Sequence, residues 1–278
     1  MSTVKPELRL VLPNRADNVA LVRQALGGVV EVLELGRARM LDINAAVSEA
    51  CNNVVVHAYQ GDQGPMDVRL CIQPDELEVV VRDRGVGIRP NLPEPDREVQ
   101  GLGLSLIQSL TDRVEFAGGV DDGTKVTMGF SFDGAAPAAL PDRGDEPVVE
   151  GPSGELSISV PPGPLAAPVL GRLIAMLAAR ADFTLEGISE AELITDTLAA
   201  HAPKATLGNT IQMGVDQRDG NLVLRIGPLE KGGAAHVIEA SALGDLPPVL
   251  ERLTGERRVE DSPDGEILCL VLERDSPA

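Results

Sequence analysis

The feature that most limits how this chain can fold is a break near its middle, between Phe132 and Glu155. The segment reads DGAAPAALPDRGDEPVVEGPSG, which is rich in proline, glycine and acidic residues and shows no apolar periodicity. Such a composition is typical of a linker. The length of 278 residues also favours two domains. We therefore expect a first domain over residues 1–133, a flexible linker over 134–154 and a second domain over 155–278.

The charge and aromatic content of the chain exclude some classes of partner. Asp and Glu number 43 against 24 Lys and Arg, a net charge of -19, and such an acidic chain repels nucleic-acid phosphates and anionic lipids. With one Tyr, four Phe and no Trp, it also lacks aromatic platforms for stacking bases. The start has no apolar run of signal-peptide length, and the three cysteines match no disulfide or metal pattern. We expect a cytoplasmic protein with no direct nucleic-acid or membrane contact.

Strand and helix patterns alternate through the first half. Strands show apolar residues at every second position, and helices show them at every third or fourth. We expect an α+β fold, a two-layer α/β sandwich whose mixed, mostly antiparallel sheet carries helices on one face. The expected elements are a strand over 7–12, a helix capped by Asn14 or Asp17, a helix over 41–59, a hairpin around Pro74 and Asp75, a helix from Leu104 to about Asp112, and two strands flanking the turn 120–123.

The second half repeats the first at an offset of about 144 residues. LEVVVRDRG from Leu77 aligns with NLVLRIGPL from Asn221, VVVHA with LAAHA, and DDGTKVTMGF with PDGEILCLVL. An internal repeat of this length predicts two copies of one fold. The alternative is a chance alignment of two domains that are both rich in Ala and Leu.

One predicted helix carries a polar stripe. In SEACNNVVVHAY, Glu49, Asn53 and His57 are spaced i, i+4 and i+8, which places them on one face. A carboxylate, an amide oxygen and an imidazole in a row suit a site that holds a hard cation and moves a proton. The alternative is an ordinary solvated helix face.

Two glycine-rich segments follow. Asp83 ends a predicted strand and precedes Gly85 and Gly87, so that a flat ligand can approach the backbone while the carboxylate accepts from an exocyclic amine. Gly101 and Gly103 are expected to open a helix, whose free N–H groups suit phosphate oxygens. The proline-rich loop 88–100 between them is expected to be a mobile lid. Neither segment is a P-loop or a dinucleotide fingerprint. Taken alone, the segment after Asp83 is also compatible with a plain turn, and so is the hairpin turn Asp122-Gly123-Thr124, whose alternative is a hydroxyl that contacts a ligand.

The order and spacing of these segments resemble those of the GHKL (Bergerat-fold) ATPases, and most closely the bacterial anti-sigma-factor serine/threonine-protein kinases. The resemblance covers roughly residues 5–133, with SEACNNVVVHAY as the N box, VRDRGVGI and GLGLSLI as the two glycine boxes, and DGTKV as the last box. It implies that ATP and Mg²⁺ are cofactors. The implied roles are a general base (Glu49), a magnesium ligand (Asn53), an acceptor for the adenine amine (Asp83), the wall beside it (Gly85, Gly87), the lid and phosphate cradle (Gly101, Gly103, Leu104), and a support for adenine through water (Thr124).

The resemblance also implies a function. It predicts an ATP-binding regulatory protein that binds a sigma factor and phosphorylates a serine of an anti-anti-sigma partner. The alternative is a nucleotide-gated protein-binding module without productive phosphoryl transfer.

The repeat offset predicts that the second domain is a degenerate GHKL-like copy without ATP-site residues. It places Glu49 on Leu193, Asn53 on Thr197 and Asp83 on Gly227. Such a copy could pair with the first domain as an intramolecular pseudo-dimer, and a homodimer of the whole chain is the other possibility.

Overall fold

The computed structural model describes residues 7–87, 97–119, 122–132, 151–208, 210–242, 244 and 246–274. These residues form two compact units, one with the elements from Glu7 to Ser131 and one with those from Leu156 to Leu272. Of the predicted linker only 151–154 is described, and of the predicted lid over 88–100 only 97–100, where α3 begins. The exact domain boundaries therefore stay a prediction.

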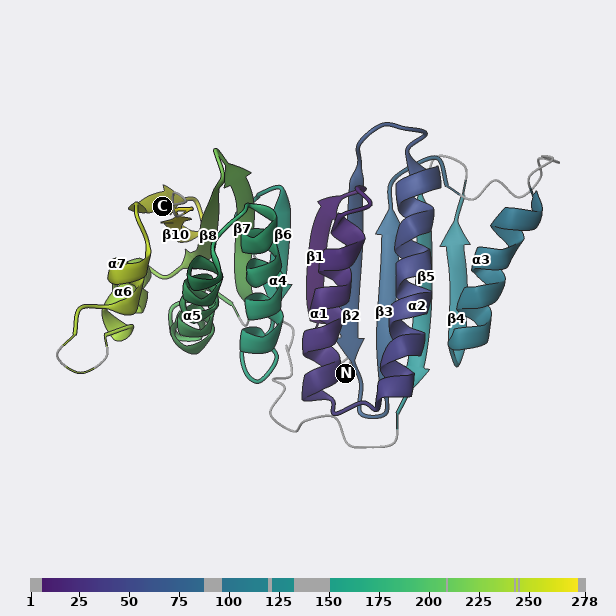
Figure 1. The fold of residues 1–278 in the computed structure, drawn as a ribbon, viewed down its shortest axis with the longest axis horizontal. Helices are drawn as coiled ribbons and strands as arrows, with labels where there is room; N and C mark the ends of the chain where they lie inside the picture. Colours follow the sequence, from purple (N-terminus) through teal and green to yellow (C-terminus); the bar gives the residue numbers. More distant parts are fainter. Residues whose placement is uncertain are drawn as a thin grey trace. The chain divides into compact units, whose positions relative to one another are not determined.

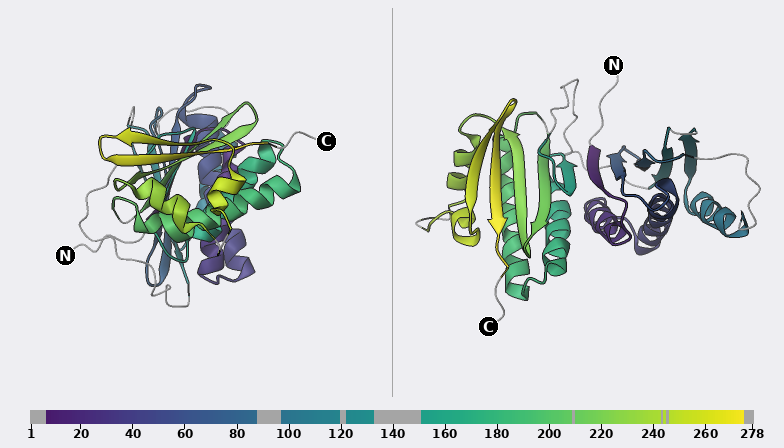
Figure 2. Two further views of the ribbon diagram at one scale, coloured as in Figure 1. Left: turned by 90° about the vertical axis from the view of Figure 1, so that its left-hand side faces the viewer. Right: turned by 90° about the horizontal axis from the view of Figure 1, so that it is seen from above.

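The first unit is a five-stranded antiparallel sheet with helices on one face (Figures 1 and 2). Its strands are in the order β4-β5-β3-β2-β1. The fold class expected from the sequence is confirmed. The elements are β1 (Glu7–Pro13), α1 (Asn18–Val32), α2 (Arg37–Asn53), a π-helix (Val54–Ala58), β2 (Pro65–Ile72), β3 (Glu76–Asp83), α3 (Arg97–Leu110), β4 (Arg113–Gly118) and β5 (Thr124–Ser131).

Alternation along the strands separates a buried face from an open one. In β1, Leu8, Leu10 and Leu12 are at most 2% exposed, while the residues between them are half-buried. β2 and β3 pair across the predicted two-residue turn, where Gln73 N donates to Glu76 O at 2.8 Å. The buried rows face the helices because only those layers can exclude water from leucine and valine.

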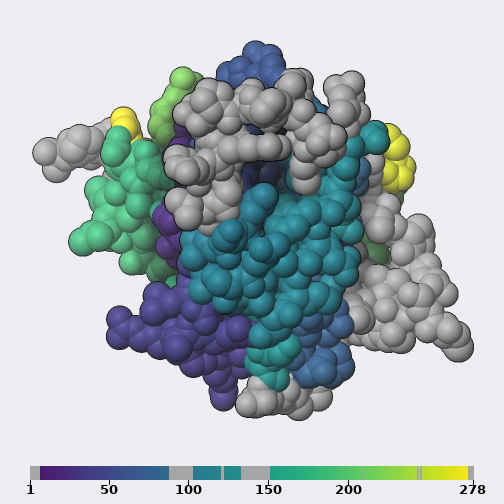
Figure 3. Space-filling model, turned by 90° about the vertical axis from the view of Figure 1, so that its right-hand side faces the viewer, coloured from purple at the N-terminus to yellow at the C-terminus, as the bar shows by residue number. Residues whose placement is uncertain are grey.

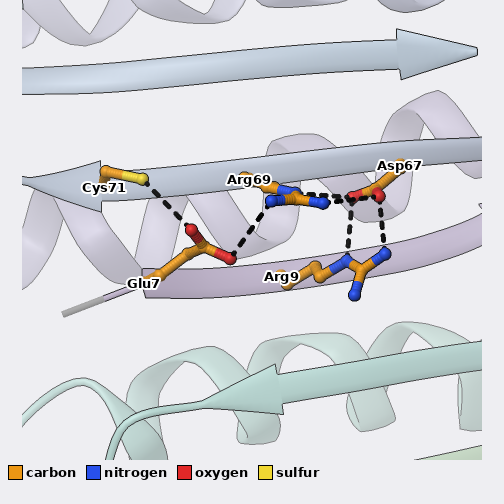
Figure 4. A network of polar contacts seen from close by, with 5 residues as sticks. All are labelled: Glu7, Arg9, Asp67, Arg69 and Cys71. Carbon is orange, nitrogen blue, oxygen red and sulfur yellow. Dashed lines mark hydrogen bonds and ion pairs between the residues drawn. The ribbon is translucent and has the colours of Figure 1, made fainter. Parts of the chain in front are cut away.

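Ion pairs cover the open face of this sheet. Asp67 on β2 accepts hydrogen bonds from Arg9 on β1 and from Arg69, and Arg69 lies 3.9 Å from Glu7 (Figure 4). Burial raises the pKa of Asp67, but the hydrogen bonds from Arg9 and Arg69 outweigh that effect and hold the pKa below its usual value. The charged side chains on the open face therefore pair with one another between the neighbouring strands β1 and β2.

Two helix boundaries differ from the sequence prediction. The helix expected over 41–59 begins at Arg37, ends at Asn53 and continues as a π-helix to Ala58. The helix expected from Leu104 begins at Arg97. Arg97, Glu98 and Gln100 are good helix formers, so the helix extends upstream through the two glycines that were expected to open it. Asp17 is the N-cap of α1, as predicted, but its side chain makes no capping bond and pairs with Arg15.

The second unit has the same order of elements and an equivalent sheet, β6-β7-β8-β10-β9, again with helices on one face (Figure 2). One difference is that two short helices, α6 and α7, replace α3. The elements are β6 (Leu156–Val160), α4 (Ala166–Arg180), α5 (Leu185–His201), a 3₁₀ turn (Ala202–Lys204), β7 (Ile211–Arg218), β8 (Asn221–Leu229), α6 (Gly233–Ala240), α7 (Val249–Leu253), β9 (Arg257–Ser262) and β10 (Gly265–Leu272).

The helix boundaries give a second offset between the two units. Helices α1 and α4 begin at 18 and 166, and α2 and α5 begin at 37 and 185, an offset of about 148. This is about one helical turn more than the expected offset of about 144. Burial does not distinguish the two offsets, because buried residues recur once per turn: at either offset four of the five buried residues of α2 fall on buried residues of α5.

The offset of the helix starts gives other counterparts for the site residues. At that offset Glu49 falls on Thr197 and Asn53 on His201. The hairpins β2–β3 and β7–β8 both turn through two residues, 74–75 and 219–220, which places Asp83 on Pro228. None of these counterparts is an acid or an amide. That the second unit is a degenerate copy without ATP-site residues stays a prediction.

The chain enters the second unit across the open face of β7. Arg225 donates to Ser153 O at 2.8 Å, and Glu155 N donates to Asp216 Oδ1 at 2.8 Å. A Cβ on Gly214 would lie 2.7 Å from Pro152 O, so a glycine is needed where the two backbones cross. Residues 151–154 are thereby fixed to the sheet.

Candidate functional site

Asp83 is the buried acid of the first unit. It ends β3, is 2% exposed, and its Oδ1 accepts from Gly85 N at 2.8 Å and from Thr124 N at 3.2 Å. Burying a carboxylate is costly unless it is hydrogen-bonded. The two bonds join the end of β3, the first glycine box and the start of β5, so the structure brings Asp83, Gly85 and Thr124 together as the sequence predicted.

The first glycine box packs backbone against backbone. A Cβ on Gly85 would lie 1.9 Å from Ala58 O, and Val86 N donates to that same carbonyl at 2.9 Å. Gly87 has φ +72°, and a Cβ there would lie 1.9 Å from Gly119 O. Only glycine fits at either position, so the wall beside Asp83 is formed by main chain.

Gly123 is a further residue of this wall that the sequence analysis did not single out. It has φ +71°, and a Cβ there would lie 2.2 Å from Asp83 O. Its position in the DGT turn was the available signal, but a glycine in a turn is too common to distinguish a site from an ordinary reversal of the chain.

The polar stripe of α2 meets the second glycine box. Glu49 and Asn53 are both half-buried and one helical turn apart, and a Cβ on Gly103 of α3 would lie 2.1 Å from Glu49 Oε1. Helix α3 packs against α2 and belongs to the part of the chain that is coloured teal in Figure 3. The expected grouping of Glu49 with Gly103 is present, and the missing side chain of Gly103 leaves room for the carboxylate.

Two details of the expected site differ. Gly101 and Gly103 lie inside α3 rather than at its first turn, so their N–H groups are not the free ones of a helix start. His57 lies in the π-helix and is exposed, so it does not continue the half-buried stripe of Glu49 and Asn53. Leu104 is 43% exposed, and its expected place in the phosphate cradle stays a prediction.

Tyr59 links the N box to the first glycine box. Its hydroxyl accepts from Arg84 N at 2.9 Å and donates to Pro65 O at 2.6 Å. Burial, together with the charge of Asp83, raises the pKa of this phenol above its usual value despite the hydrogen bond from Arg84. Tyr59 ends the N box SEACNNVVVHAY, and no pattern in the sequence assigned it a role.

Other kinds of site find little support in the described part of the chain. It holds no group of three or more His, Cys, Asp or Glu side chains placed to bind a metal ion, and none of its helices has the length and apolarity to cross a membrane. The three cysteines are free. Burial raises the pKa of Cys51 and of Cys71 to about 12, so these thiols stay protonated and are poor nucleophiles.

Comparison with known proteins agrees with this geometry. Residues 12–130 match the Histidine kinase-like ATPase domain, which spans the first unit from β1 to β5. The serine-protein kinase RsbW of Bacillus mycoides (strain KBAB4) is 32% identical over 134 residues, which cover 44% of this chain and 82% of that protein. The anti-sigma F factor of Oceanobacillus iheyensis is 28% identical over 134 residues, 45% of this chain and 92% of that protein.

A solved structure also aligns with the whole chain, although weakly. The crystal structure of the RsbU and RsbW domains of Rv1364c from Mycobacterium tuberculosis covers 99% of this chain and 89% of its own, with 11% sequence identity and a TM-score of 0.30. That likeness is too low to carry an argument about the fold.

The fold and the site of the first unit thus define a histidine kinase-like ATPase domain of the GHKL class. Within that class, the chain belongs to the family of the RsbW serine-protein kinases and anti-sigma F factors. The prediction that the protein is an ATP-dependent serine/threonine-protein kinase is confirmed at the level of this family.

Proposed function

We propose that the protein is a cytoplasmic regulatory kinase that binds a sigma factor and transfers a phosphoryl group from ATP to a serine of an anti-anti-sigma protein. The observation that carries this proposal is the arrangement around Asp83 and Glu49: a buried acid bound to the glycine wall, and a second acid facing Gly103. The names of the relatives, serine-protein kinase and anti-sigma F factor, support it.

Asp83 is the residue to which we assign recognition of the purine. Its Oδ1 accepts both backbone bonds, and Oδ2 is the atom we assign to the exocyclic amine of adenine. Gly85 and Gly87 keep the adjacent wall free of side chains, so that a flat ring can lie against main chain. Thr124 begins β5 beside the acid and is placed to support the same ring.

The residues of α2 fit a divalent ion bound to phosphates. Asn53 offers a half-buried amide oxygen one turn from Glu49, and Mg²⁺ prefers oxygen ligands while keeping several of its waters. Bound ATP with Mg²⁺ would supply the phosphoryl group and neutralise its charge. Asn53 would hold the ion, and Gly101, Gly103 and Leu104 of α3 would lie beside the phosphates.

Glu49 is the group to which we assign the proton transfer. A serine hydroxyl is a weak nucleophile until its proton is accepted by a nearby base. The Glu49 carboxylate, which lies against Gly103, would accept that proton as the serine oxygen attacks. The half-buried position of Glu49 fixes the carboxylate while leaving it open to an incoming side chain.

The second unit is proposed to be a degenerate copy that does not bind ATP. Its sheet order matches that of the first unit, and at the offset of the helix starts Thr197, His201 and Pro228 stand where Glu49, Asn53 and Asp83 would be needed. Its pairing with the first unit, or a homodimer of the whole chain, stays a prediction that light scattering tests.

The proposed function is tested by phosphoryl transfer from labelled ATP, with magnesium, to a candidate anti-anti-sigma protein. We expect Glu49→Gln to reduce transfer at least about 100-fold while ATP still binds, because only the proton acceptor is lost. The matched control is Glu192→Gln, an exposed acid on α5 of the second unit, which should leave transfer unchanged. Transfer that persists in Glu49→Gln contradicts the assigned base.

The same experiment separates the proposal from a nucleotide-gated binding module. A module of that kind would bind its partner only when ATP is present, and no labelled phosphate would appear on any serine. That result would remove the kinase step and leave the nucleotide site intact.

A further inference from the structure

Tyr59 contacts three segments that meet at the nucleotide wall. It directly follows the π-helix, its hydroxyl donates to Pro65 O at the start of β2, and it accepts from Arg84 N in the glycine box. A Cβ on Gly64 would lie 2.1 Å from Cε1 of the Tyr59 ring, so the ring packs flat against a glycine. Ring and hydroxyl are both fixed by main chain.

The hydroxyl acts on the part of the backbone that carries Asp83. Arg84 N belongs to the peptide bond that joins Asp83 to Arg84. The hydrogen bond from Arg84 N to the Tyr59 hydroxyl therefore orients the plane of the peptide that directly follows Asp83. Two residues on, Val86 N donates to Ala58 O at 2.9 Å. Segment 58–59 therefore holds segment 84–86 at two points, on both sides of Gly85.

The Tyr59 hydroxyl bonds to two main-chain groups at once, because a phenol can both donate and accept at one atom. The ordinary pKa of a phenol already keeps this hydroxyl protonated at neutral pH, as the bond to Pro65 O requires, and burial raises that pKa further.

We propose that Tyr59 is a positioning residue for nucleotide recognition, because its hydroxyl fixes the main chain that aims Asp83 at the purine. The inference rests on the proposed function, since it assumes that Asp83 binds the purine. Tyr59 itself does not touch the phosphates in this assignment. Its loss should therefore weaken nucleotide binding and leave the phosphoryl-transfer step unchanged.

The test compares Tyr59→Phe with Arg23→Ala. Tyr59→Phe keeps the ring and loses only the hydroxyl, and we expect ATP and ADP to bind about 10-fold more weakly, with an unchanged kcat at saturating ATP. Arg23→Ala removes an exposed side chain of α1 that lies outside the assigned site, so it should match the wild type. Equal nucleotide affinity in Tyr59→Phe and the wild type, or a fall in kcat, would overturn the role.

A second readout does not depend on the variant. The sequence has one Tyr and no Trp, so tyrosine emission comes from residue 59 alone. Saturating ATP should change that emission in the wild-type protein. If calorimetry detects nucleotide binding while the emission stays constant, the positioning role fails and the proposed function survives. If calorimetry detects no nucleotide binding at all, the proposed function itself fails.

Discussion

In the first unit the loop that follows β3 is bound by Asp83, an acid of β3 itself, whereas in the second unit the loop that follows β8 is bound by Glu266, an acid of β10. Asp83 accepts both of its backbone bonds on Oδ1. Glu266 uses both oxygens, Oε1 for Gly232 N at 2.8 Å and Oε2 for Ala234 N at 3.3 Å. Each unit thus uses one carboxylate to satisfy backbone donors at the same point of its fold.

The two acids differ in what their carboxylates bind. Glu266 caps the start of α6, where a carboxylate satisfies free N–H groups and interacts favourably with the helix dipole. That helix end is therefore already occupied by an anion of the chain itself. Asp83, in contrast, is 2% exposed and caps no helix, and it makes both of its backbone bonds through Oδ1, which leaves Oδ2 for the adenine amine in the proposed assignment.

The largest expected effect is on a pair of equivalent glycines. Gly87 and Gly232 have similar backbone angles, φ +72° and +80°, but a Cβ would lie 1.9 Å from Gly119 O in the first and meets nothing within 4 Å in the second. We expect Gly87→Ala to lower the free energy of unfolding of the first unit by about 3 kcal/mol and Gly232→Ala to lower that of the second by about 1 kcal/mol.

Urea unfolding measures both effects. Tyr59 fluorescence follows the first unit and far-ultraviolet circular dichroism follows both. Equal losses in the two variants would mean that the backbone angle, rather than the close approach of Gly119, sets the cost.

The second prediction concerns Asp83. Asp83→Asn removes the charge but keeps a similar shape, and we expect ATP to bind about 30-fold more weakly, which corresponds to about 2 kcal/mol for a hydrogen bond to a charged acceptor. Isothermal titration calorimetry with magnesium measures it. Glu266→Gln is the control for this experiment and should leave ATP affinity unchanged; a loss of affinity there would place the nucleotide in the second unit.

A smaller effect is expected for the stability of the second unit. Glu266→Gln removes the negative charge at the start of α6 and weakens two bonds, so the free energy of unfolding should fall by about 1 kcal/mol. Thermal unfolding followed by circular dichroism should show this fall equally with and without ATP. An ATP-dependent difference would contradict the view that Glu266 is purely structural.

The smallest effect concerns pH and an acid on each open sheet face. Burial raises the pKa of Asp67 and of Asp216, but hydrogen bonds from Arg9 and Arg69 in the first case, and from Glu155 N and Arg225 in the second, hold both below the usual 3.8. A depressed pKa gives stability that is present above 3.8 and is lost as pH falls through the lower folded-state value.

Asp67→Asn and Asp216→Asn should each flatten the acid limb of the stability curve, by less than about 1 kcal/mol. Chemical unfolding between pH 5 and pH 2 measures the slope, at pH values chosen to span roughly one unit on either side of the usual carboxyl pKa. A variant whose acid limb is as steep as that of the wild type would show that the ion pair does not depress the pKa.

Much of the first unit could be predicted because its signals are local. Alternation along β1 to β3 and the two-residue turn at Pro74 and Asp75 define the hairpin without reference to the rest of the chain. The placement of Asp83 next to Gly85 is also local, since they are two residues apart on one strand end. The link from Asp83 to Thr124 followed from the resemblance rather than from any local pattern.

The start of α3 and the π-helix could not be read in the same way. The hydrophobic pattern is uninformative around Gly101 and Gly103. A glycine is as compatible with the start of a helix as with close packing inside one, and Gly103 packs closely against Glu49. A π-helix differs from an α-helix in its i→i+5 hydrogen bonds rather than in its residue pattern, so the change at Val54–Ala58 could not be predicted from the sequence.

The attachment of residues 151–154 to β7 has a practical consequence for protein engineering. Because Arg225 and Asp216 hold Ser153 and Glu155 in place, the register of β6 is set downstream of Gly151. Insertions or deletions made before Gly151 should therefore leave the assembly of the second sheet unchanged. Gly151 marks a point upstream of which the length of the chain can be varied without disturbing this unit.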